Sequence, residues 1–333
     1  MAQAVKGPCV DGHKLRLAHI GCGRWGANIV RELVAHPLVE LVVVVDTSEA
    51  AQHAAQTLCP TARIERHVRA LEAYFPQAVT IASPGGCHAR HSAMALGFGA
   101  DVFVEKPMTI GLTKARQLVM LSERLGRVGM VGHLLRYHPA VQKMLQIVRA
   151  GVIGEPLWFR SERLCVTNSR DTEESVLWSL APHDVSLLFA LDPGGVCSSE
   201  LSRGSRSLAG RPTRMSLRFV MNSGLQAHIV VSRGSDTKVR CTTVVGREGW
   251  VCFDDASPRA SLLLRTSTGS YPVPVFSSRT PLQSELDTFV RCVRTRCQPV
   301  TDFREGLRVV EALHQLEISS AVSARRPSLA VQP

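Results

Sequence analysis

The hydrophobic positions in the first part of the chain form short continuous runs rather than alternating ones. These runs occupy residues 15–20, 39–45, 78–82, 101–104 and 128–132. Continuous runs of this length are typical of strands buried on both faces of a parallel sheet. The segments between the runs have helical periodicity at 27–35, 49–58 and 113–125. Strands that alternate with helices predict stacked βαβ units, so we expect a doubly wound α/β domain here.

The pattern changes near residue 135. A strand is expected at 156–164 and a helix at 175–191. Further strands are expected at 214–221, 225–232, 238–245, 250–254 and 261–266. Gly246-Arg247-Glu248-Gly249 has the composition of a hairpin turn. Helical patterns at 282–296 and 304–320 would cover this sheet or return to the first domain. We expect a leader over 1–13, the α/β domain over 14–134, and an α+β domain with an open, mostly antiparallel sheet over 135–333.

Three glycines follow the first apolar run with the spacing of a dinucleotide-binding turn. Gly21, Gly23 and Gly26 enclose Cys22, Arg24 and Trp25 in a G-x-G-x-x-G pattern. The first glycine permits the tight turn, the second lets a pyrophosphate approach the backbone, and the third lets the helix sit close to the strand. The N-terminus of the following helix then offers N–H groups to the phosphates. These six residues are candidate cofactor contacts in a Rossmann domain.

Asp46 ends the second apolar run, 20 residues after Gly26. This is the position at which such folds place the carboxylate that binds the adenosine ribose. A carboxylate here repels a 2′-phosphate, and Thr47 and Ser48 add no arginine beside it. The sequence therefore predicts NAD as the cofactor, in preference to NADP.

The composition narrows the class of protein. The chain has 333 residues, with 45% hydrophobic and 20% charged residues. No run approaches the roughly 20 apolar residues that span a bilayer, and the first 14 residues lack the apolar core of a signal peptide. We expect a cytoplasmic protein that does not insert into a membrane. The 10 cysteines are scattered, which predicts small core residues rather than disulfides or a metal site.

The formal net charge is +11, but the basic residues are spread along the chain and aromatic residues make up only 5%. Nucleic-acid binding would require clustered charge with interleaved aromatic side chains, so we do not expect it. Two readings remain open. The charge is a solvated basic surface, or it attracts an anionic substrate.

Two further turns follow parallel strands, where ligands bind in such sheets. Ser83 and Pro84 end the run at 78–82 and should border the nicotinamide or its ribose. His88 and His91 begin the next helix. They share a helix face, but no carboxylate or cysteine stands nearby, so we expect packing near the cofactor rather than metal binding.

The second turn is Glu105-Lys106-Pro107. Pro107 stops the strand and favours an extended conformation at Lys106. A lysine fixed at the end of a parallel strand should point into the ligand cleft, although spacing alone leaves a surface lysine equally open.

These motifs together resemble a known family. The glycine turn, Ala82-Ser83-Pro84 with His88, Glu105-Lys106-Pro107 and Arg136-Tyr137-His138-Pro139 occur in matching order and spacing. The resemblance, over about residues 14–320, is to the glucose–fructose oxidoreductase, inositol dehydrogenase and rhizopine-catabolism (Gfo/Idh/MocA) family. It implies a Rossmann domain followed by an open antiparallel sheet, with substrate held between the nicotinamide and the sheet. It also implies an NAD(P)-dependent oxidoreductase acting on CH–OH groups, with Glu105 and Lys106 at the cofactor.

The second domain carries a variant of a family motif. Many members have Asp-x-x-x-His on its first long helix, and here His183 matches the histidine whereas Ser179 replaces the aspartate. The surrounding sequence resembles the branch that oxidises the 3-hydroxyl of UDP-N-acetylglucosamine or of its uronic acid. The resemblance makes the following residues candidate substrate contacts: Arg136, Tyr137, His138, Arg163, Asn168, Arg170, Trp178, Ser179 and Asp184.

Oxidation of an alcohol requires a base for the hydroxyl proton and a cation for the developing alkoxide. Lys106 can supply the cation. His183 is the candidate base because its ordinary pKa lies near neutrality, and Asp184 could orient it or cap the helix. Arg163 and Arg170 could contact a diphosphate, or they are solvated surface arginines.

Two alternatives remain beside a nucleotide-sugar dehydrogenase. One is a regulator that binds dinucleotide without turnover, and the other is an enzyme that acts on a free sugar, a cyclitol or an imine. The apolar run at 227–231 lies on a sheet face that no neighbouring helix in the sequence obviously covers. Such faces usually mark interfaces, so we expect a homodimer or homotetramer.

Overall fold

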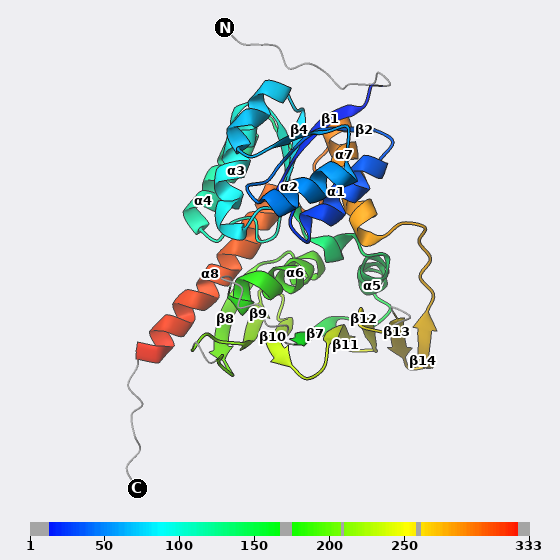
Figure 1. Ribbon diagram of the computed structural model, residues 1–333. Helices are drawn as coiled ribbons and strands as arrows, with labels where there is room; N and C mark the ends of the chain where they lie inside the picture. The colour runs from blue at the N-terminus through cyan, green and yellow to red at the C-terminus, as the bar shows by residue number, and fades with distance from the viewer. Residues whose placement is uncertain (1–12, 167–174, 208–209, 258–260, 326–333) are drawn as a thin grey trace. The chain divides into compact units, whose positions relative to one another are not determined.

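The computed structural model describes residues 13–166, 175–207, 210–257 and 261–325 (Figure 1). The chain forms two compact units. Unit 1 comprises residues 1–137 and 279–310, and unit 2 comprises residues 138–278 and 311–333. The first boundary lies within three residues of the predicted one. The assignment of everything after residue 134 to a second domain is corrected, because residues 279–310 pack into unit 1. No helix in the described part of the chain is long and apolar enough to cross a membrane.

Sheet A of unit 1 is fully parallel, with the strand order β3-β2-β1-β4-β5-β6. Its strands are β1 (Leu15–Ile20), β2 (Val39–Val45), β3 (Arg63–Glu65), β4 (Ala78–Ile81), β5 (Asp101–Glu105) and β6 (Gly129–Gly132). Five of these strands follow the predicted runs. The three-residue β3 has no apolar run and was not predicted. The direction of strand succession reverses between β1 and β4, and ligands bind beyond the carboxyl ends of strands at such a point.

Helices cover both faces of sheet A, as the Rossmann prediction requires (Figure 1). The helices α1 (Gly26–Ala35) and α2 (Glu49–Leu58) contact each other on one side. The helices α3 (Gly85–Gly97) and α4 (Leu112–Arg124) contact each other on the other side. This arrangement follows from right-handed crossovers that run in opposite directions from β1 and β4. All of β4 is buried, which explains its continuous apolar sequence.

A distant segment completes unit 1. The helix α7 (Pro281–Thr295) begins with a capping box between Thr280 and Gln283 and packs beside α1. Its Phe289 ring lies 5.8 Å from the ring of Phe103 on β5. The helix α8 (Phe303–Arg325) then starts against β6 and continues into unit 2. A Cβ atom on Gly306 would lie 2.6 Å from a Val131 methyl group, so glycine permits this close approach.

Sheet B of unit 2 has eight strands in the order β14-β13-β12-β11-β7-β10-β9-β8. Its strands are β7 (Pro156–Val166), β8 (Val196–Arg203), β9 (Arg214–Met221), β10 (Gln226–Ser235), β11 (Val239–Gly246), β12 (Trp250–Asp254), β13 (Ser261–Thr266) and β14 (Gly269–Val273). Only β7 and β10 pair in parallel, so the prediction of a mostly antiparallel sheet is confirmed. The edge strands β8 and β14 were not predicted.

The two faces of sheet B differ in burial. One cross-strand row consists of Val251, Val244, Phe159, Ala227 and Phe219, all of them buried. The helices α5 (Pro139–Arg149) and α6 (Val176–Leu191) contact the strands of this sheet. The expectation that the apolar run at 227–231 lacks a covering helix is therefore wrong, because α6 packs on β10 within the same chain.

The opposite face carries another cross-strand row, which includes Trp158, Gln226 and Val220. Trp158 is 43% exposed and Val220 is 40% exposed. Large apolar side chains therefore remain accessible on this outer face, in contrast to the covered inner face.

Candidate functional site

The glycine turn after β1 has two glycines that the fold requires and one that it does not. Gly21 has φ +93°, and a Cβ atom there would lie 2.6 Å from the backbone nitrogen of Ser83. A Cβ atom on Gly26 would lie 1.8 Å from the Gly21 carbonyl oxygen. Gly23 is exposed, and a Cβ atom there would meet nothing within 4 Å. The backbone at Gly23 is therefore open to a ligand, which fits the close approach of a pyrophosphate.

The buried His19 on β1 stabilises this turn. Its role was not identified from the sequence. Its Nε2 lies 2.9 Å from the Gly21 carbonyl oxygen, and its Nδ1 lies 2.8 Å from the Thr80 hydroxyl. Complete burial lowers the pKa of His19 to about 4, so the ring is neutral at pH 7. Nε2–H then donates to Gly21 and Nδ1 accepts from Thr80. A histidine inside a buried strand was the available signal, because a buried polar group needs partners.

Asp46 follows β2 and is held by backbone donors. Its Oδ2 accepts from the Cys22 N–H at 2.7 Å, and its Oδ1 accepts from the Ser48 N–H at 2.9 Å. The Gln52 amide also donates to the Asp46 carbonyl oxygen at 2.7 Å. A carboxylate has about four acceptor sites, so each oxygen can still accept from a ribose hydroxyl. Asp46 thus has the fixed position that ribose recognition requires.

A cavity of about 1040 Å³ lies beyond the carboxyl ends of β1, β2 and β4. It is lined by predicted cofactor residues: Gly21, Gly23, Asp46, Ser83 and Pro84. It is also lined by three arginines that were not predicted from the sequence: Arg66, Arg69 and Arg90. Arg66 lies 3.6 Å from a Glu49 oxygen in an exposed ion pair. The size, glycine backbone, carboxylate and basic lining together fit a dinucleotide with its two phosphates.

His88 joins the turn after β4 to the turn after β5. Its Nε2 lies 2.7 Å from the Ser83 carbonyl oxygen, and its Nδ1 lies 2.7 Å from the Pro107 carbonyl oxygen. Carbonyl oxygens only accept, so both bonds form together only when both ring nitrogens carry hydrogen. His91 lies 2.9 Å from the Ser83 hydroxyl. Burial, with nearby Arg90, lowers the pKa of His91 to about 4. Both histidines therefore serve the architecture of the turns.

Glu105 connects the glycine turn to the lysine turn. Its carboxylate is only 7% exposed and accepts from the Trp25 indole N–H at 2.5 Å. It also accepts from the Lys106 backbone N–H at 3.2 Å. Burial raises the pKa of Glu105, whereas the Trp25 bond and the Lys106 charge oppose that rise. The Trp25 indole N–H, expected near the cofactor, is thus bound to Glu105. Lys106 itself is half-buried.

Tyr137 and Arg136, in the segment after β6, contact residues from the last part of the chain. The Tyr137 hydroxyl is buried 2.8 Å from the Thr301 hydroxyl, and burial raises its pKa. Arg136 lies 3.5 Å from Glu305, whose other oxygen lies 2.7 Å from His133. These contacts join the segment after β6 to Glu305 on α8 and to Thr301 just before it. The substrate contacts of Tyr137 and Arg136 stay a prediction.

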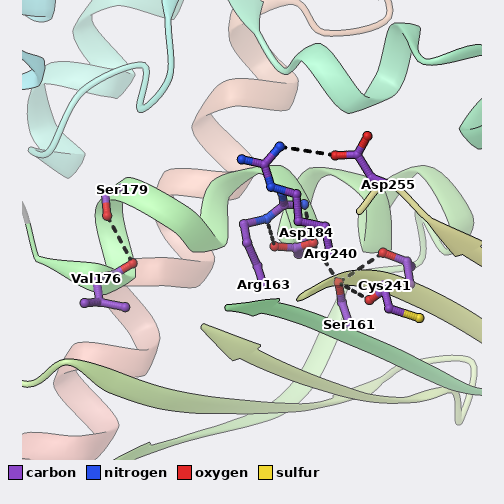
Figure 2. Close-up of polar contacts among 9 residues, drawn as sticks. Ser161, Arg163, Val176, Ser179, Asp184, Arg240, Cys241 and Asp255 are labelled. Atoms are coloured by element: carbon purple, nitrogen blue, oxygen red, sulfur yellow. Dashed lines mark hydrogen bonds and ion pairs between the residues drawn. The ribbon is translucent and has the colours of Figure 1, made fainter. Parts of the chain in front are cut away.

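A buried ion pair in unit 2 engages two other predicted substrate residues (Figure 2). Arg163 on β7 makes a bidentate contact with Asp184 on α6, at 2.9 and 3.0 Å. The Ser161 hydroxyl also donates to Asp184 at 2.7 Å. The expectation that Asp184 caps α6 is wrong, because Ser175 is the N-cap. The buried Arg163 guanidinium is bound to Asp184, and substrate contacts at these two residues stay a prediction.

Trp178 and Ser179 are also directed into unit 2. The Trp178 indole N–H donates to Glu317 at 3.2 Å, and its ring packs edge-on against His314. The Ser179 hydroxyl donates to the Val176 carbonyl oxygen at 3.4 Å (Figure 2). Both residues are buried and pack within α6 and onto α8, and their substrate contacts stay a prediction.

The remaining predicted residues fall into three groups. His138 caps α5, accepting from the Ala140 N–H at 3.2 Å, and its ring packs 4.7 Å from that of Phe253. Burial lowers its pKa. Asn168 and Arg170 lie outside the described residues. His183 is half-buried on α6 in unit 2, whereas Lys106 belongs to unit 1.

Residues 15–133 match the GFO_IDH_MocA family, described as an oxidoreductase family with an NAD-binding Rossmann fold. These residues belong to that family. The chain is accordingly an NAD-binding oxidoreductase whose second unit has the mostly antiparallel sheet that the resemblance implied.

Similar proteins extend the likeness over the whole chain. The UDP-N-acetylglucosamine 3-dehydrogenase of Acidithiobacillus ferrooxidans is 24% identical over 92% of this chain and 97% of its own length. A solved structure of that enzyme has a TM-score of 0.83, with 22% identity over 93% of this chain and 98% of its own. The NAD-dependent scyllo-inositol 2-dehydrogenase of Bacillus subtilis is 30% identical over 44% of each chain. Structures with this fold hold NAD in some cases and NADP in others.

The Arg163–Asp184 pair gives a stability prediction. Arg163→Met should lower the free energy of unfolding by about 3–5 kcal/mol, because it leaves the Asp184 charge buried without its cation. Chemical denaturation would measure the change. The control is Arg218→Met, which removes an exposed pair with Glu200 and should cost less than about 1 kcal/mol. An Arg163→Met protein of unchanged stability with a raised KM would restore the substrate-binding interpretation.

Proposed function

We propose that this protein is an NAD-dependent dehydrogenase that transfers hydride between the cofactor and a hydroxyl of a nucleotide-linked sugar, of the 3-dehydrogenase type. The observation that carries the proposal is the cavity at the β1–β4 switch point, where Asp46 and the glycine turn lie beside Ser83. The end-to-end likeness to a UDP-N-acetylglucosamine 3-dehydrogenase supports the substrate class.

The cofactor-binding proposal assigns one task to each element. The open backbone at Gly23 and the N-terminus of α1 hold the phosphates. Asp46 accepts from the adenosine ribose and disfavours a 2′-phosphate. The bound nicotinamide would accept the hydride from the substrate carbon. The turn at Ser83 and Pro84 and the turn at Lys106 border the end of the site where this exchange occurs.

Lys106 and His183 are the proposed catalytic residues. Lys106 polarises the substrate oxygen, because an ammonium group stabilises the alkoxide that forms as the proton leaves. His183 accepts that proton, since an imidazole is the side chain best matched to proton transfer near neutral pH. Ser179 replaces the aspartate of the family motif and is bound to Val176. The proposal therefore assigns the base to His183 and not to a carboxylate.

Two alternatives are to be separated from this proposal by experiment. A free-sugar or cyclitol dehydrogenase is favoured by the likeness of 44% of the chain to an inositol dehydrogenase. A dinucleotide-binding regulator would need only the first unit's cavity. The presence of Lys106 and His183 favours an enzyme. Screening nucleotide sugars, free sugars and inositols for NAD reduction separates the three, since a regulator reduces NAD with none of them.

The proposed function makes three predictions, of which the first concerns catalysis. Lys106→Met or His183→Ala should lower turnover by about 10²–10⁴-fold, the range for losing acid–base assistance. The affinity for NAD should change far less, because the phosphates rest on the glycine turn. Steady-state kinetics and NAD titration measure the two effects separately. Wild-type turnover in Lys106→Met would remove the lysine from the mechanism, and in His183→Ala it would remove the histidine.

The second prediction concerns cofactor choice. NAD should bind more tightly than NADP, and Asp46→Asn should weaken NAD binding by about 10–100-fold, the loss expected for one charged hydrogen bond. The asparagine keeps the side-chain size and an acceptor oxygen but removes the charge that repels a 2′-phosphate. Titration of both cofactors into both proteins tests this. An NADP dissociation constant below that of NAD in the wild type contradicts it.

The third prediction concerns assembly. We propose a homodimer or homotetramer formed through the outer face of sheet B, where Trp158 and Val220 are exposed. Burial of such side chains favours association. Trp158→Glu should dissociate the assembly, whereas Phe276→Glu, at an exposed loop position, should leave it intact. Light scattering that gives a monomer for the wild type at micromolar concentration refutes the proposal.

A further inference from the structure

Glu285 on α7 is a buried acid that the proposed chemistry does not use. Its side chain is fully buried, and neither carboxyl oxygen has a hydrogen-bond partner within the described residues. Its surroundings on α7 are Leu282, Leu286 and Phe289, which belong to the apolar core of unit 1. An ionised carboxylate without partners in such a place is strongly disfavoured.

The register of two packed elements brings Glu285 toward Glu105. Phe103 and Glu105 are two residues apart on β5 and so lie on the same face of the strand. Glu285 and Phe289 are four residues apart on α7 and so lie on the same helix face. The rings of Phe103 and Phe289 are in contact, with centroids 5.8 Å apart. The face of β5 that carries Glu105 is therefore the one that meets the face of α7 carrying Glu285.

The two carboxyl groups differ in their hydrogen-bond donors. Glu105 accepts from the Trp25 indole and from the Lys106 backbone, whereas Glu285 accepts from no described group. Burial raises the pKa of Glu285 well above its ordinary value, and the charge of Glu105 raises it further. The donors decide which of the two groups carries a negative charge.

Other charged or titratable groups surround the pair. Lys106, just after β5, and His133, just after β6, both lower the pKa of Glu105. Tyr137 lies near Glu285 and is influenced by Arg136 and Glu305. On α7 itself, Asp287 lies 2.7 Å from Arg279 and 3.5 Å from His36 at the exposed side of the helix. Of these groups, Lys106 is the cation adjacent to Glu105 in the chain.

We propose that Glu105 and Glu285 form a buried acid pair that holds one proton, with Glu285 as the protonated member and Glu105 as the anion beside Lys106. Glu285 is then a positioning residue. With the proton on Glu285, the pair carries one negative charge instead of two. Glu105 therefore remains bound to the Trp25 indole and to the Lys106 backbone. Loss of the proton would place two carboxylates in one apolar core and favour displacement of α7 or of the lysine turn.

The proton has a consequence for stability. Folded protein retains a proton on Glu285 at pH values where the unfolded chain, with an ordinary glutamate, has released it. The unfolding equilibrium therefore shifts toward the unfolded state as the pH rises from the ordinary glutamate value toward the raised folded value. One retained proton changes the unfolding constant by about tenfold per pH unit in that window.

The direct experiment is infrared spectroscopy of the full chain between pH 6 and pH 9, which needs no substrate. The wild type should show the carbonyl absorption of a protonated, buried carboxyl group, and Glu285→Gln should lack it. The control Asp287→Asn, two residues along the same helix, should retain it. An absorption that persists in Glu285→Gln, or that is absent from the wild type, overturns the proposal.

Stability measurements add a second readout. The tenfold-per-pH-unit term in the unfolding constant should disappear in Glu285→Gln, whose amide mimics the neutral acid, and persist in Asp287→Asn. Should Glu285→Gln fail to fold, Glu105→Gln serves instead. It removes the neighbouring charge, so the infrared absorption of Glu285 should titrate at a lower pH. An unchanged titration in Glu105→Gln contradicts the pairing.

The positioning role rests on the proposed function and has its own readout. Glu285→Gln should keep wild-type turnover near neutral pH, and its alkaline loss of turnover should shift to higher pH, with NAD affinity unchanged. A profile identical to the wild type refutes positioning. If no substrate is found, the proposed function fails, yet the infrared and unfolding measurements still decide whether the acid pair exists.

Discussion

The Glu105 carboxylate is the contact on which the cofactor side of the site depends. It accepts from the Trp25 indole on the glycine turn and from the Lys106 backbone on the neighbouring turn. These turns follow β1 and β5, which β4 separates in sheet A. The carboxyl group also packs against Gly132, where an added Cβ would lie 3.1 Å from its oxygens. One buried carboxyl group thus ties together the ends of strands that are not adjacent in the sheet.

The two units solve the same physical problem in different ways. A buried charge needs partners, and in unit 2 Asp184 has them in Arg163 and Ser161. This pair fixes α6 to β7, so the residue immediately before Asp184, His183, has a defined place on the helix. In unit 1 the second carboxyl group, Glu285, has no hydrogen-bond donor among the described residues. Burial disfavours the charged form of a carboxyl group without donors, so such a group is less destabilising when it is protonated and neutral.

The sequence predicted what depends on local pattern. The five longer strands of sheet A, the glycine turn and Asp46 could be predicted because continuous apolar runs and φ-dependent glycines leave local signals. The return of residues 279–310 to unit 1 could not, because the helical pattern of α7 shows an apolar face without showing which core it joins. His19 and Glu285 were missed since their roles depend on partners more than 60 residues away along the chain, such as Thr80 and Glu105.

The substrate contacts stay predictions, and the reason is chemical. A resemblance to the nucleotide-sugar branch of the family assigned Arg163, Trp178, Ser179 and Asp184 to the substrate. The same side chains also satisfy one another, and the structure shows that Asp184 and Glu317 are the partners of Arg163 and Trp178. Of the motif Ser179-Leu180-Ala181-Pro182-His183-Asp184, the serine hydroxyl and the aspartate are therefore engaged inside unit 2. The proposed mechanism therefore assigns proton transfer in this helix segment to His183, because histidine is the one residue type in it whose ordinary pKa lies near neutrality.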